Sequence, residues 1–270
     1  MKSANFDTRP RRFPKKIIAF LLDPATIPGM TDSRPTLTLT LKDGTRLTGE
    51  SFGAHVETAG EVVFNTGMIG YPESFTDPSY KDQILVLTYP LIGNYGVPEG
   101  KAMAKTATKK TPRVEELFES DDIHLAGIVV SEYSENHNHW QAKQSLGAWL
   151  KKKGVPGISG IDTRALTQKL RTKGAMLGTI SPDPTKKLPF YDPNAKNLVA
   201  EVSVKKPIHY EAMSTANGRT ARSTPKHIAL VDCGMKLNIL RSFLRRGVSV
   251  TRVPWNYDFW TKMSKTKFDG

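Results

Sequence analysis

Alternating apolar and polar positions dominate the first half of the chain and predict β-strands. Leu37, Leu39 and Leu41 alternate with threonines in TLTLTL, which is the period of a half-buried strand. Asp43-Gly44 follows and predicts a two-residue hairpin turn. Three more apolar runs, GEVVFNTG, KDQILVLTYPL and HLAGIVVSEY, predict further strands. This part of the chain should therefore be rich in β-structure.

Two amphipathic helices are expected after these strands. HWQAKQSLGAWLKKKG has an apolar face from Ala142 to Leu150, and Gly154 should end the helix. IDTRALTQKLRTKG has a candidate N-cap at Asp162 and ends at Gly174. The predicted domain is a strand-rich β/α domain closed by these two helices.

The last part of the chain changes its pattern and predicts a β-α-β unit. HIALVDCG is an apolar run that ends in glycine, MKLNILRSFLRRG has one apolar helical face, and VSVTRVPW is typical of a strand. A parallel sheet needs more strands, with helices on both faces. We therefore expect an α/β domain that is incomplete within this sequence and continues beyond Gly270.

These patterns predict a mixed α/β chain with four segments. Residues 1–34 are basic and interrupted by prolines, so we expect a disordered N-terminal extension. Residues 35–182 form the strand-rich domain, and 227–270 form the incomplete α/β domain. Between them, 183–226 is rich in Pro, Lys and Thr and is predicted to be an interdomain connection, with a short strand in LVAEVSV.

Composition and charge narrow the function classes. The chain is 38% hydrophobic and 24% charged, which is typical of globular proteins, and no apolar run approaches the roughly 18 residues of a membrane span. Its single cysteine excludes an intramolecular disulfide and a cysteine-rich zinc site. The net charge is +13, and the Lys and Arg residues that carry it are scattered along the chain. They form no basic stripe interleaved with aromatic residues, so a solvated basic surface is favoured over nucleic-acid binding.

Most candidate chemical motifs have a simpler structural explanation. The sequence has no standard phosphate-binding glycine loop, no Gly-x-Ser-x-Gly and no His-Glu-x-x-His. His137 and His139 in HNH suggest a metal site, but the favoured interpretation is that they are polar residues just before a helix, at its entry. Cys233 is a candidate nucleophile, but a small packing residue at a strand end is favoured.

YPESFTDPSY is the most specific stretch. Asp77-Pro78 followed by Ser79 predicts a turn that would hold the serine hydroxyl in a defined place. A purely structural loop is the alternative.

Three collinear stretches carry a resemblance to a known family. GEVVFNTGMIGYPESFTDPSYKDQILVLTYPLIGNYGVP and HWQAKQSLGAWLKKKGVPGISGIDTRALTQKLRTKGAMLGTI resemble the N-terminal domain of the small, glutamine-hydrolysing chain of carbamoyl phosphate synthetase. IALVDCGMKLNILRSFLRRGVSVTRVPW resembles the first β-α-β of that family's class I glutamine amidotransferase domain. The sequence of these stretches resembles the eukaryotic fused pyrimidine-pathway enzymes more than the bacterial subunits.

The resemblance implies an enzyme that hydrolyses glutamine through a cysteinyl thioester in a Cys-His-Glu site. The ammonia passes to a synthetase component, fused or separate, which uses ATP, Mg and bicarbonate to make carbamoyl phosphate for pyrimidine or arginine synthesis. It implies no cofactor in this chain. From the scattered charge and the lack of a long apolar run, we expect neither a nucleic acid nor a membrane as partner. We expect a cytoplasmic location, or a mitochondrial one if residues 1–34 are a transit peptide.

Only one site residue of the family carries over. Ser79 matches the serine that reaches the glutamine substrate. The family's Gly-x-Cys-x-Gly-x-Gln elbow is not in the sequence, and we expect it, with the His-x-Glu that follows it, beyond Gly270. Cys233 matches a non-catalytic position after the first strand. The chain alone is therefore expected to be inactive; the alternative is an inactive docking module for the synthetase.

Overall fold

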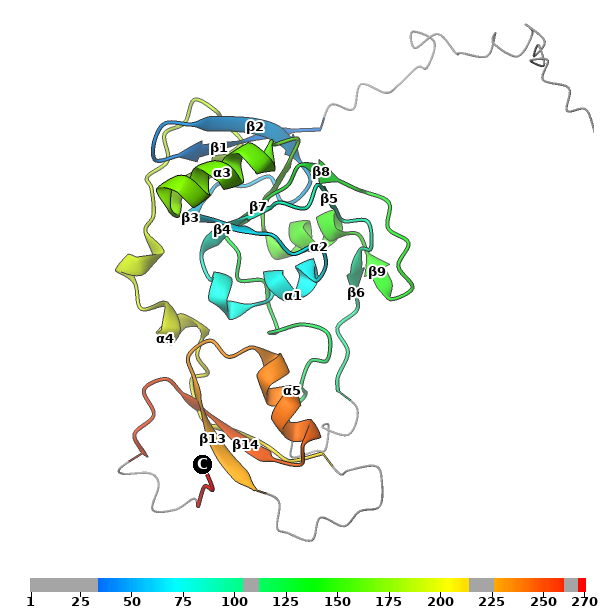
Figure 1. The fold of residues 1–270 in the computed structure, drawn as a ribbon, viewed down its shortest axis with the longest axis vertical. Coiled ribbons are helices and arrows are strands. Elements are labelled where there is room, and N and C mark those ends of the chain that lie inside the picture. The colour runs from blue at the N-terminus through cyan, green and yellow to red at the C-terminus, as the bar shows by residue number, and fades with distance from the viewer. Residues whose placement is uncertain (1–33, 104–111, 214–225, 260–266) are drawn as a thin grey trace, which may run out of the picture. The chain divides into compact units, whose positions relative to one another are not determined.

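The computed structural model describes residues 34–103, 112–213, 226–259 and 267–270. It shows a closed β-barrel and a separate three-stranded sheet, with helices beside both (Figure 1). This confirms a mixed α/β chain with strand-rich sheets. The predicted extension over 1–34, including its possible role as a transit peptide, lies outside the described residues except for Arg34.

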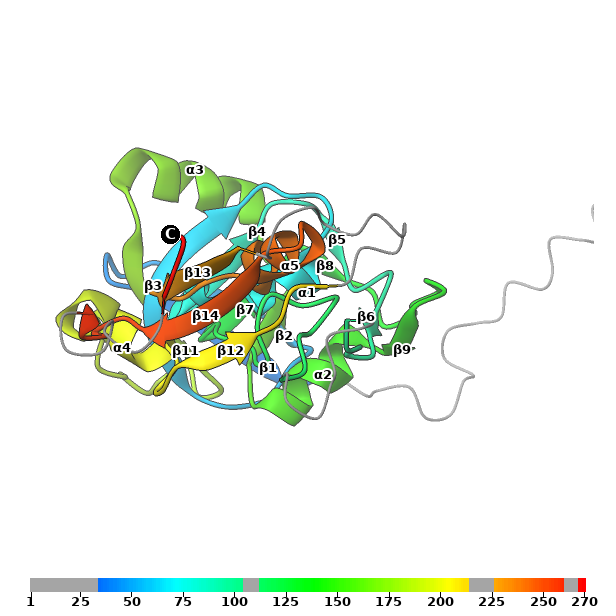
Figure 2. The same ribbon diagram turned by 90° about the horizontal axis from the view of Figure 1, so that it is seen from below.

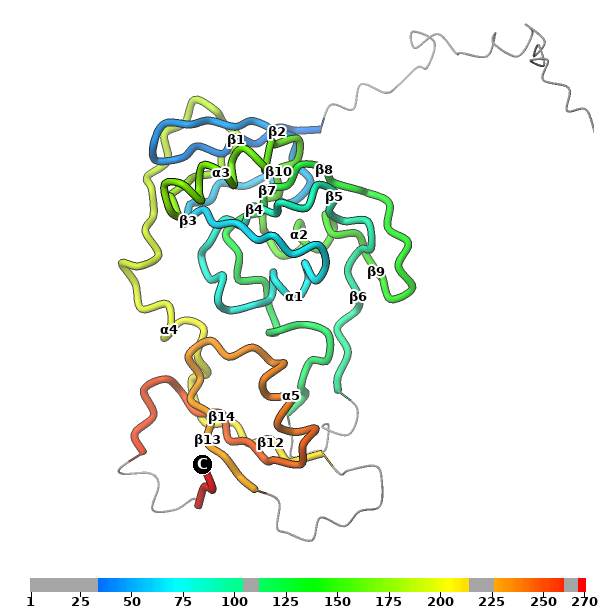
Figure 3. The backbone as a smooth tube through the Cα atoms, viewed as in Figure 1, coloured from blue at the N-terminus to red at the C-terminus, as the bar shows by residue number. Residues whose placement is uncertain are grey.

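The barrel closes in the order β1-β11-β3-β4-β7-β10-β2. Figure 3 shows the path of the backbone through this part of the chain. Its strands are β1 (Thr36–Leu41), β2 (Arg46–Ser51), β3 (Thr58–Asn65), β4 (Gln83–Leu87), β7 (Gly127–Val129), β10 (Gly157–Ser159) and β11 (Met176–Ser181). The pairs β3/β4, β4/β7 and β7/β10 are parallel, and the other pairs are antiparallel. The predicted run HLAGIVVSEY is divided between β7 and a short β8 (Glu132–Tyr133).

The first hairpin has a longer turn than the sequence predicts. Leu41 donates its amide to the carbonyl of Thr45 at 2.8 Å, and Gly44 donates to the carbonyl of Leu41 at 2.9 Å. Gly44 has φ 88°, so it supplies the left-handed residue of a three-residue loop. The strand and hairpin predictions are confirmed, and the two-residue turn is wrong.

The plain apolar run of β4 is explained by burial on both faces. Ile84 and Val86 belong to one hydrophobic cluster, together with Leu39 of β1. Leu85 and Leu87 belong to a second cluster that includes aromatic residues of the neighbouring helices. Parallel strands covered on both sides have this continuous apolar pattern.

Three helices cover the barrel strands: α1 (Tyr71–Phe75), α2 (Leu146–Lys153) and α3 (Thr163–Lys173). Asp162 caps α3 by accepting from the amide of Ala165, and Gly174 ends it, as predicted. The helix predicted from HWQAKQSLGAWLKKKG begins later than expected, because Ser145 caps it and Ala142 lies in β9 (Ala142–Gln144).

The second sheet has the order β12-β14-β13 (Figure 2). The strands β13 (His227–Asp232) and β14 (Ser249–Pro254) are parallel and are joined by α5 (Leu237–Arg245), which confirms the predicted β-α-β unit. Antiparallel β12 (Ile208–Tyr210) was not predicted. Gly270 accepts from the amide of Ala229 at 2.9 Å, so the last residues lie along β13.

The short strand predicted in LVAEVSV is wrong, because the structure has a helix there, α4 (Leu198–Val202). Asn197 caps it by accepting from the amide of Ala200 at 3.0 Å. This local cap outweighs the strand preference of the valines. The remaining short elements are β5 (Leu91–Ile92), β6 (Val97–Pro98) and the 3-10 turns η3 (Pro78–Tyr80) and η4 (Pro193–Ala195).

Candidate functional site

Ser79 lies on a 3-10 turn whose geometry is fixed by the residue two positions before it. Asp77 caps η3, and its Oδ1 accepts from the amide of Ser79 at 2.9 Å. Pro78 fills the first helical position, where its missing N–H costs nothing. Ser79 itself is exposed. The predicted turn is confirmed, and it presents the serine to the surface on a rigid base; its ligand stays a prediction.

The second oxygen of Asp77 ties this turn to the residue before α5. Lys236 Nζ lies 2.7 Å from Asp77 Oδ2, and the Asp77 side chain is only 7% exposed while that of Lys236 is 47% exposed. The hydrogen bond to Asp77 raises the pKa of Lys236, so the ammonium is retained. One buried carboxylate therefore shapes the Ser79 turn and attaches it to the β13–α5 loop.

Gly234 in the β13–α5 loop lies against the same turn. It has φ +93°, and a Cβ placed there would be 3.0 Å from Val202 Cγ2 and 3.4 Å from Pro78 Cβ. Both the backbone conformation and the close approach favour glycine. The loop that joins β13 to α5 and the turn that carries Ser79 are thus neighbours.

Cys233 is exposed, which contradicts the prediction of a packing residue. The residue that turns inward at the end of β13 is Asp232, which is fully buried. Its carboxylate accepts from the amides of Gly234, Met235 and Val204 and pairs with Arg252 at 2.7 Å. Cys233 follows the last residue of β13 and lies at the surface beside this buried network.

The two histidines of HNH do not lie at a helix entry, as the sequence favoured, but in the loop before β9. The His139 ring lies 6.2 Å from that of Tyr95 and 5.7 Å from that of Trp140. Nδ1 of His137 is buried and has no hydrogen-bond partner. Across the described ranges, no group of three His, Cys, Asp or Glu residues could hold a metal ion.

Two His-x-Glu triplets occur in the sequence, His55-Val56-Glu57 and His209-Tyr210-Glu211, and neither pattern had been singled out. His209 is exposed on β12, its Nδ1 lies 3.0 Å from Thr251 Oγ1, and its ring lies edge-on to that of His227. Both triplets precede β13 along the chain, whereas the family's triplet follows the cysteine elbow. We therefore assign neither triplet a catalytic role.

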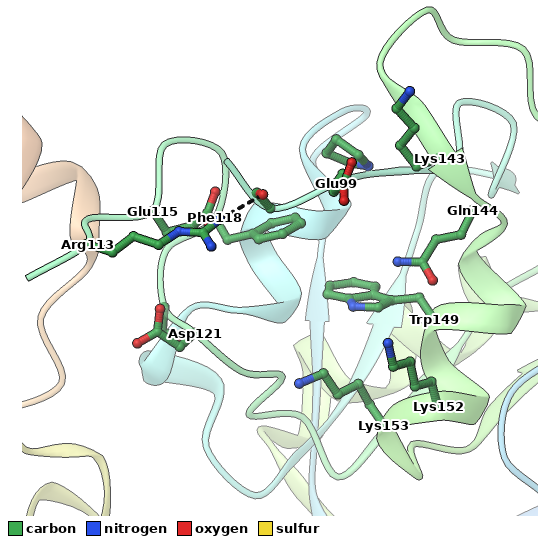
Figure 4. Close-up of a pocket in the computed structure, with 13 residues that line it drawn as sticks. Glu99, Arg113, Glu115, Phe118, Asp121, Lys143, Gln144, Trp149, Lys152 and Lys153 are labelled. Atoms are coloured by element: carbon green, nitrogen blue, oxygen red, sulfur yellow. Dashed lines mark hydrogen bonds and ion pairs between the residues drawn. The ribbon is translucent and has the colours of Figure 1, made fainter. Parts of the chain in front are cut away.

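A surface cleft of about 620 Å³ is lined by residues of 98–100 and 113–121 and by residues of 143–153, and Ser79 does not line it (Figure 4). The rings of Phe118 and Trp149 stack in its wall with centroids 5.6 Å apart. Its charged lining residues have both signs: Glu99, Glu115, Asp121, Arg113, Lys143, Lys152 and Lys153. The cleft is therefore a mixed-charge surface, separate in its lining from the Ser79 turn.

In the part of the chain that the structure describes, no helix is long and apolar enough to cross a membrane.

The sequence pointed to Ser79 and to Asp77 beside it, but it missed Lys236, which pairs with Asp77 across the fold. Lys236 lies far from Asp77 in the sequence and has no distinguishing motif of its own. Only the Asp-Pro pair beside Ser79 carried a local signal. The ion pair forms because the barrel segment and the start of α5 meet in space, which single-sequence patterns do not reveal.

Comparisons with known proteins show the family. Residues 39–180 match the family model described as carbamoyl-phosphate synthase small chain, CPSase domain. The Multifunctional protein URA2 of Saccharomyces cerevisiae is 44% identical over 92% of this chain, which corresponds to 12% of that protein. The Multifunctional protein CAD of Squalus acanthias is 47% identical over 86% of this chain and 10% of its own length.

A separate small chain is also similar. The carbamoyl phosphate synthase arginine-specific small chain of Yarrowia lipolytica is 48% identical over 82% of this chain and 47% of its own length. The chain thus spans about half or less of the length of these relatives. The family match covers more than half of the chain and contains the whole Ser79 turn. The chain belongs to the carbamoyl-phosphate synthase small chain family.

Proposed function

We propose that this chain is the N-terminal portion of the glutaminase of a glutamine-dependent carbamoyl phosphate synthetase. The observation that carries the proposal is the family match over residues 39–180, which includes the ordered Asp77-Pro78-Ser79 turn. The glutaminase would release ammonia from glutamine, and a synthetase component would combine it with bicarbonate at the expense of ATP, with Mg. The product would serve pyrimidine or arginine synthesis, as the relatives' names suggest.

In this proposal Ser79 contacts the glutamine substrate. Its hydroxyl can accept from the α-ammonium or donate to the α-carboxylate. The exposed position of Ser79 and the rigid cap from Asp77 support such a role, because a fixed donor loses little freedom on binding. The β-α-β unit of β13, α5 and β14 would be the start of the class I amidotransferase domain.

The nucleophile of the proposed glutaminase is a cysteine in a Gly-x-Cys-x-Gly-x-Gln elbow, not Cys233. Cys233 follows β13 without that motif. The synthetase partner would be fused or separate, because the relatives include both multifunctional proteins and a small chain. No resident cofactor is proposed for this chain, and we propose a cytoplasmic location.

Transfer of a labelled amide nitrogen tests this function. The intact gene product, assayed with its synthetase component, is given glutamine labelled with ¹⁵N at the side-chain amide, together with ATP, Mg and bicarbonate. We expect ¹⁵N in carbamoyl phosphate and glutamate formation in equal amounts. Label retained entirely in glutamine, with synthesis from free ammonia intact, would contradict the proposal.

A second candidate function is an inactive docking module for the synthetase component. It would hold if the intact gene product has no cysteine elbow of the family type. In that case the gene product would bind the synthetase and leave ammonia-dependent synthesis active, but it would release no glutamate. Co-purification combined with the same labelling experiment separates the two functions.

A further inference from the structure

The N-terminus of α5 is capped by a residue from a distant part of the chain. Lys236 occupies the N-cap position and makes no side-chain cap hydrogen bond. Instead, Leu237 donates its amide to the carbonyl of Glu119 at 2.9 Å, and Asn238 donates its amide to Glu119 Oε2 at 2.8 Å. Glu119 therefore satisfies two of the first-turn amides that a helix leaves unpaired, and its charge suits the positive end of the helix.

Arg241 holds the Glu119 carboxylate in this orientation. Arg241 Nη2 donates to Glu119 Oε1 at 2.9 Å, while Nη1 donates to the carbonyls of Glu115 at 2.9 Å and Phe118 at 2.7 Å. The side chains of Arg241 and Glu119 are only 6% and 13% exposed. With both carboxylate oxygens bonded, Glu119 has one fixed position relative to α5.

The opposite side of the same segment is bonded to the residue that precedes the Ser79 turn. Glu119 donates its amide to Thr76 Oγ1 at 3.0 Å, and Ser120 Oγ donates to the carbonyl of Thr76 at 2.6 Å. Thr76 is 1% exposed and is followed directly by Asp77. Movement of Glu119 would therefore be passed to the turn through two short hydrogen bonds.

These contacts form a closed ring. From Glu119 the ring runs through Thr76 to Asp77, then across the 2.7 Å ion pair to Lys236, and back along the first turn of α5 to Glu119. Ser79 is attached to this ring by the hydrogen bond that its amide donates to Asp77. The ring fixes Ser79 relative to the β13–α5 loop at two separate points.

We propose that Glu119 is a positioning residue for the substrate contact of Ser79. The inference rests on the proposed function, in which Ser79 must meet a glutamine held largely by the α/β domain. Glu119 touches no substrate in this account; it sets the distance between the serine turn and that domain. A displacement of about 1 Å at such a contact costs up to about a hundred-fold in rate.

A double-mutant cycle in the intact gene product, assayed with its synthetase component, tests the inference. Glu119→Gln keeps the shape and places an NH₂ group where the carboxylate accepts a hydrogen bond. We expect Glu119→Gln and Ser79→Ala each to raise the glutamine KM about ten-fold, with unchanged ammonia-dependent synthesis. The double variant should lie within about two-fold of Ser79→Ala, because both changes remove one contact.

Glu116→Gln is the matched control on the same segment. Among the residues that the structure describes, the Glu116 carboxylate pairs at longer range, 3.6 Å from Lys101 and 3.9 Å from Arg245. We expect its glutamine KM to equal that of the wild type. Thr76→Val removes the hydroxyl that accepts from the Glu119 amide, and it tests the same connection if Glu119→Gln does not fold. It should raise the glutamine KM in the same way.

Two results would overturn the inference. A lower melting temperature of Glu119→Gln with an unchanged glutamine KM would leave Glu119 a purely stabilising residue. Multiplicative effects of Glu119→Gln and Ser79→Ala would show that they act independently. A failure of the proposed function is recognised separately, because Ser79→Ala alone would then leave the glutamine KM unchanged.

Discussion

Removal of the buried Arg241 guanidinium should be among the most damaging single changes to the docking of α5. Arg241→Met keeps much of the side-chain volume but deletes the donors to the carbonyls of Glu115 and Phe118 and to the Glu119 carboxylate. Breaking a buried ion pair by removing one partner costs about 3–5 kcal/mol, because the remaining charge is left without compensation. Asn238 still donates to Glu119, so we expect the lower end, about 3 kcal/mol.

Arg245→Met is the matched control on the same helix. The Arg245 side chain is 51% exposed and lies 3.9 Å from Glu116, so its loss should cost about 0–1 kcal/mol. Urea unfolding of the full chain, followed by far-UV circular dichroism, compares the two variants. Hydrogen exchange of the α5 amides should be about a hundred-fold faster in Arg241→Met, from about 1.4 kcal/mol for each factor of ten. Equal stability of both variants would refute the stabilising role of the Arg241 hydrogen bonds to Glu115, Phe118 and Glu119.

Two other changes test local features of the structure. The pKa of His124 is lowered below its usual 6.5, first by burial and then by the positive charge of Lys81. Near and below pH 6.5 the unfolded chain therefore binds more protons than the folded chain, so the stability of the fold should decrease as the pH drops. His124→Gln keeps a donor toward Ser120 and should flatten that fall in thermal melts; an unchanged pH profile would refute the assignment. Gly234→Ala should cost about 1–2 kcal/mol in urea unfolding for the left-handed conformation alone, and a neutral result would contradict the φ of +93°.

Local sequence signals predicted much of the fold. The period of two in TLTLTL placed Leu37, Leu39 and Leu41 inside, where all three are fully buried. The Asp162 cap and the Gly174 end bounded α3 correctly, because capping depends on a few neighbouring residues. The parallel β-α-β unit followed from the change of period after His227.

Non-local interactions account for most of what the sequence could not predict. The antiparallel pairing of β12 with β14 joins a stretch that has no strand pattern of its own to a distant edge. The cap of α5 comes from Glu119, so no sequence window around Lys236 contains it. The barrel order likewise depends on which strands meet in space. Among the candidate site residues, only Ser79 combined a local sequence signal with a functional match to the family.

The late start of α2 has a different cause. Ala142 fits the helical apolar face of the sequence, but the backbone of 142–144 pairs with β6 and Ser145 supplies a cap three residues before Ala148. Tertiary pairing here outweighs helical periodicity. The outward position of Cys233 is similar, because the buried Asp232 network decides which side chain turns inward.

The most direct test of the account is the glutamine dependence of Ser79→Ala. The variant of the intact gene product is assayed with its synthetase component at varied glutamine, and then at varied ammonia. Loss of one hydrogen bond to a charged group is worth about 1.5–3 kcal/mol, so the glutamine KM should rise about ten-fold or more while ammonia-dependent synthesis is unchanged. An unchanged glutamine KM, or equal losses with both nitrogen sources, would contradict a substrate contact at Ser79.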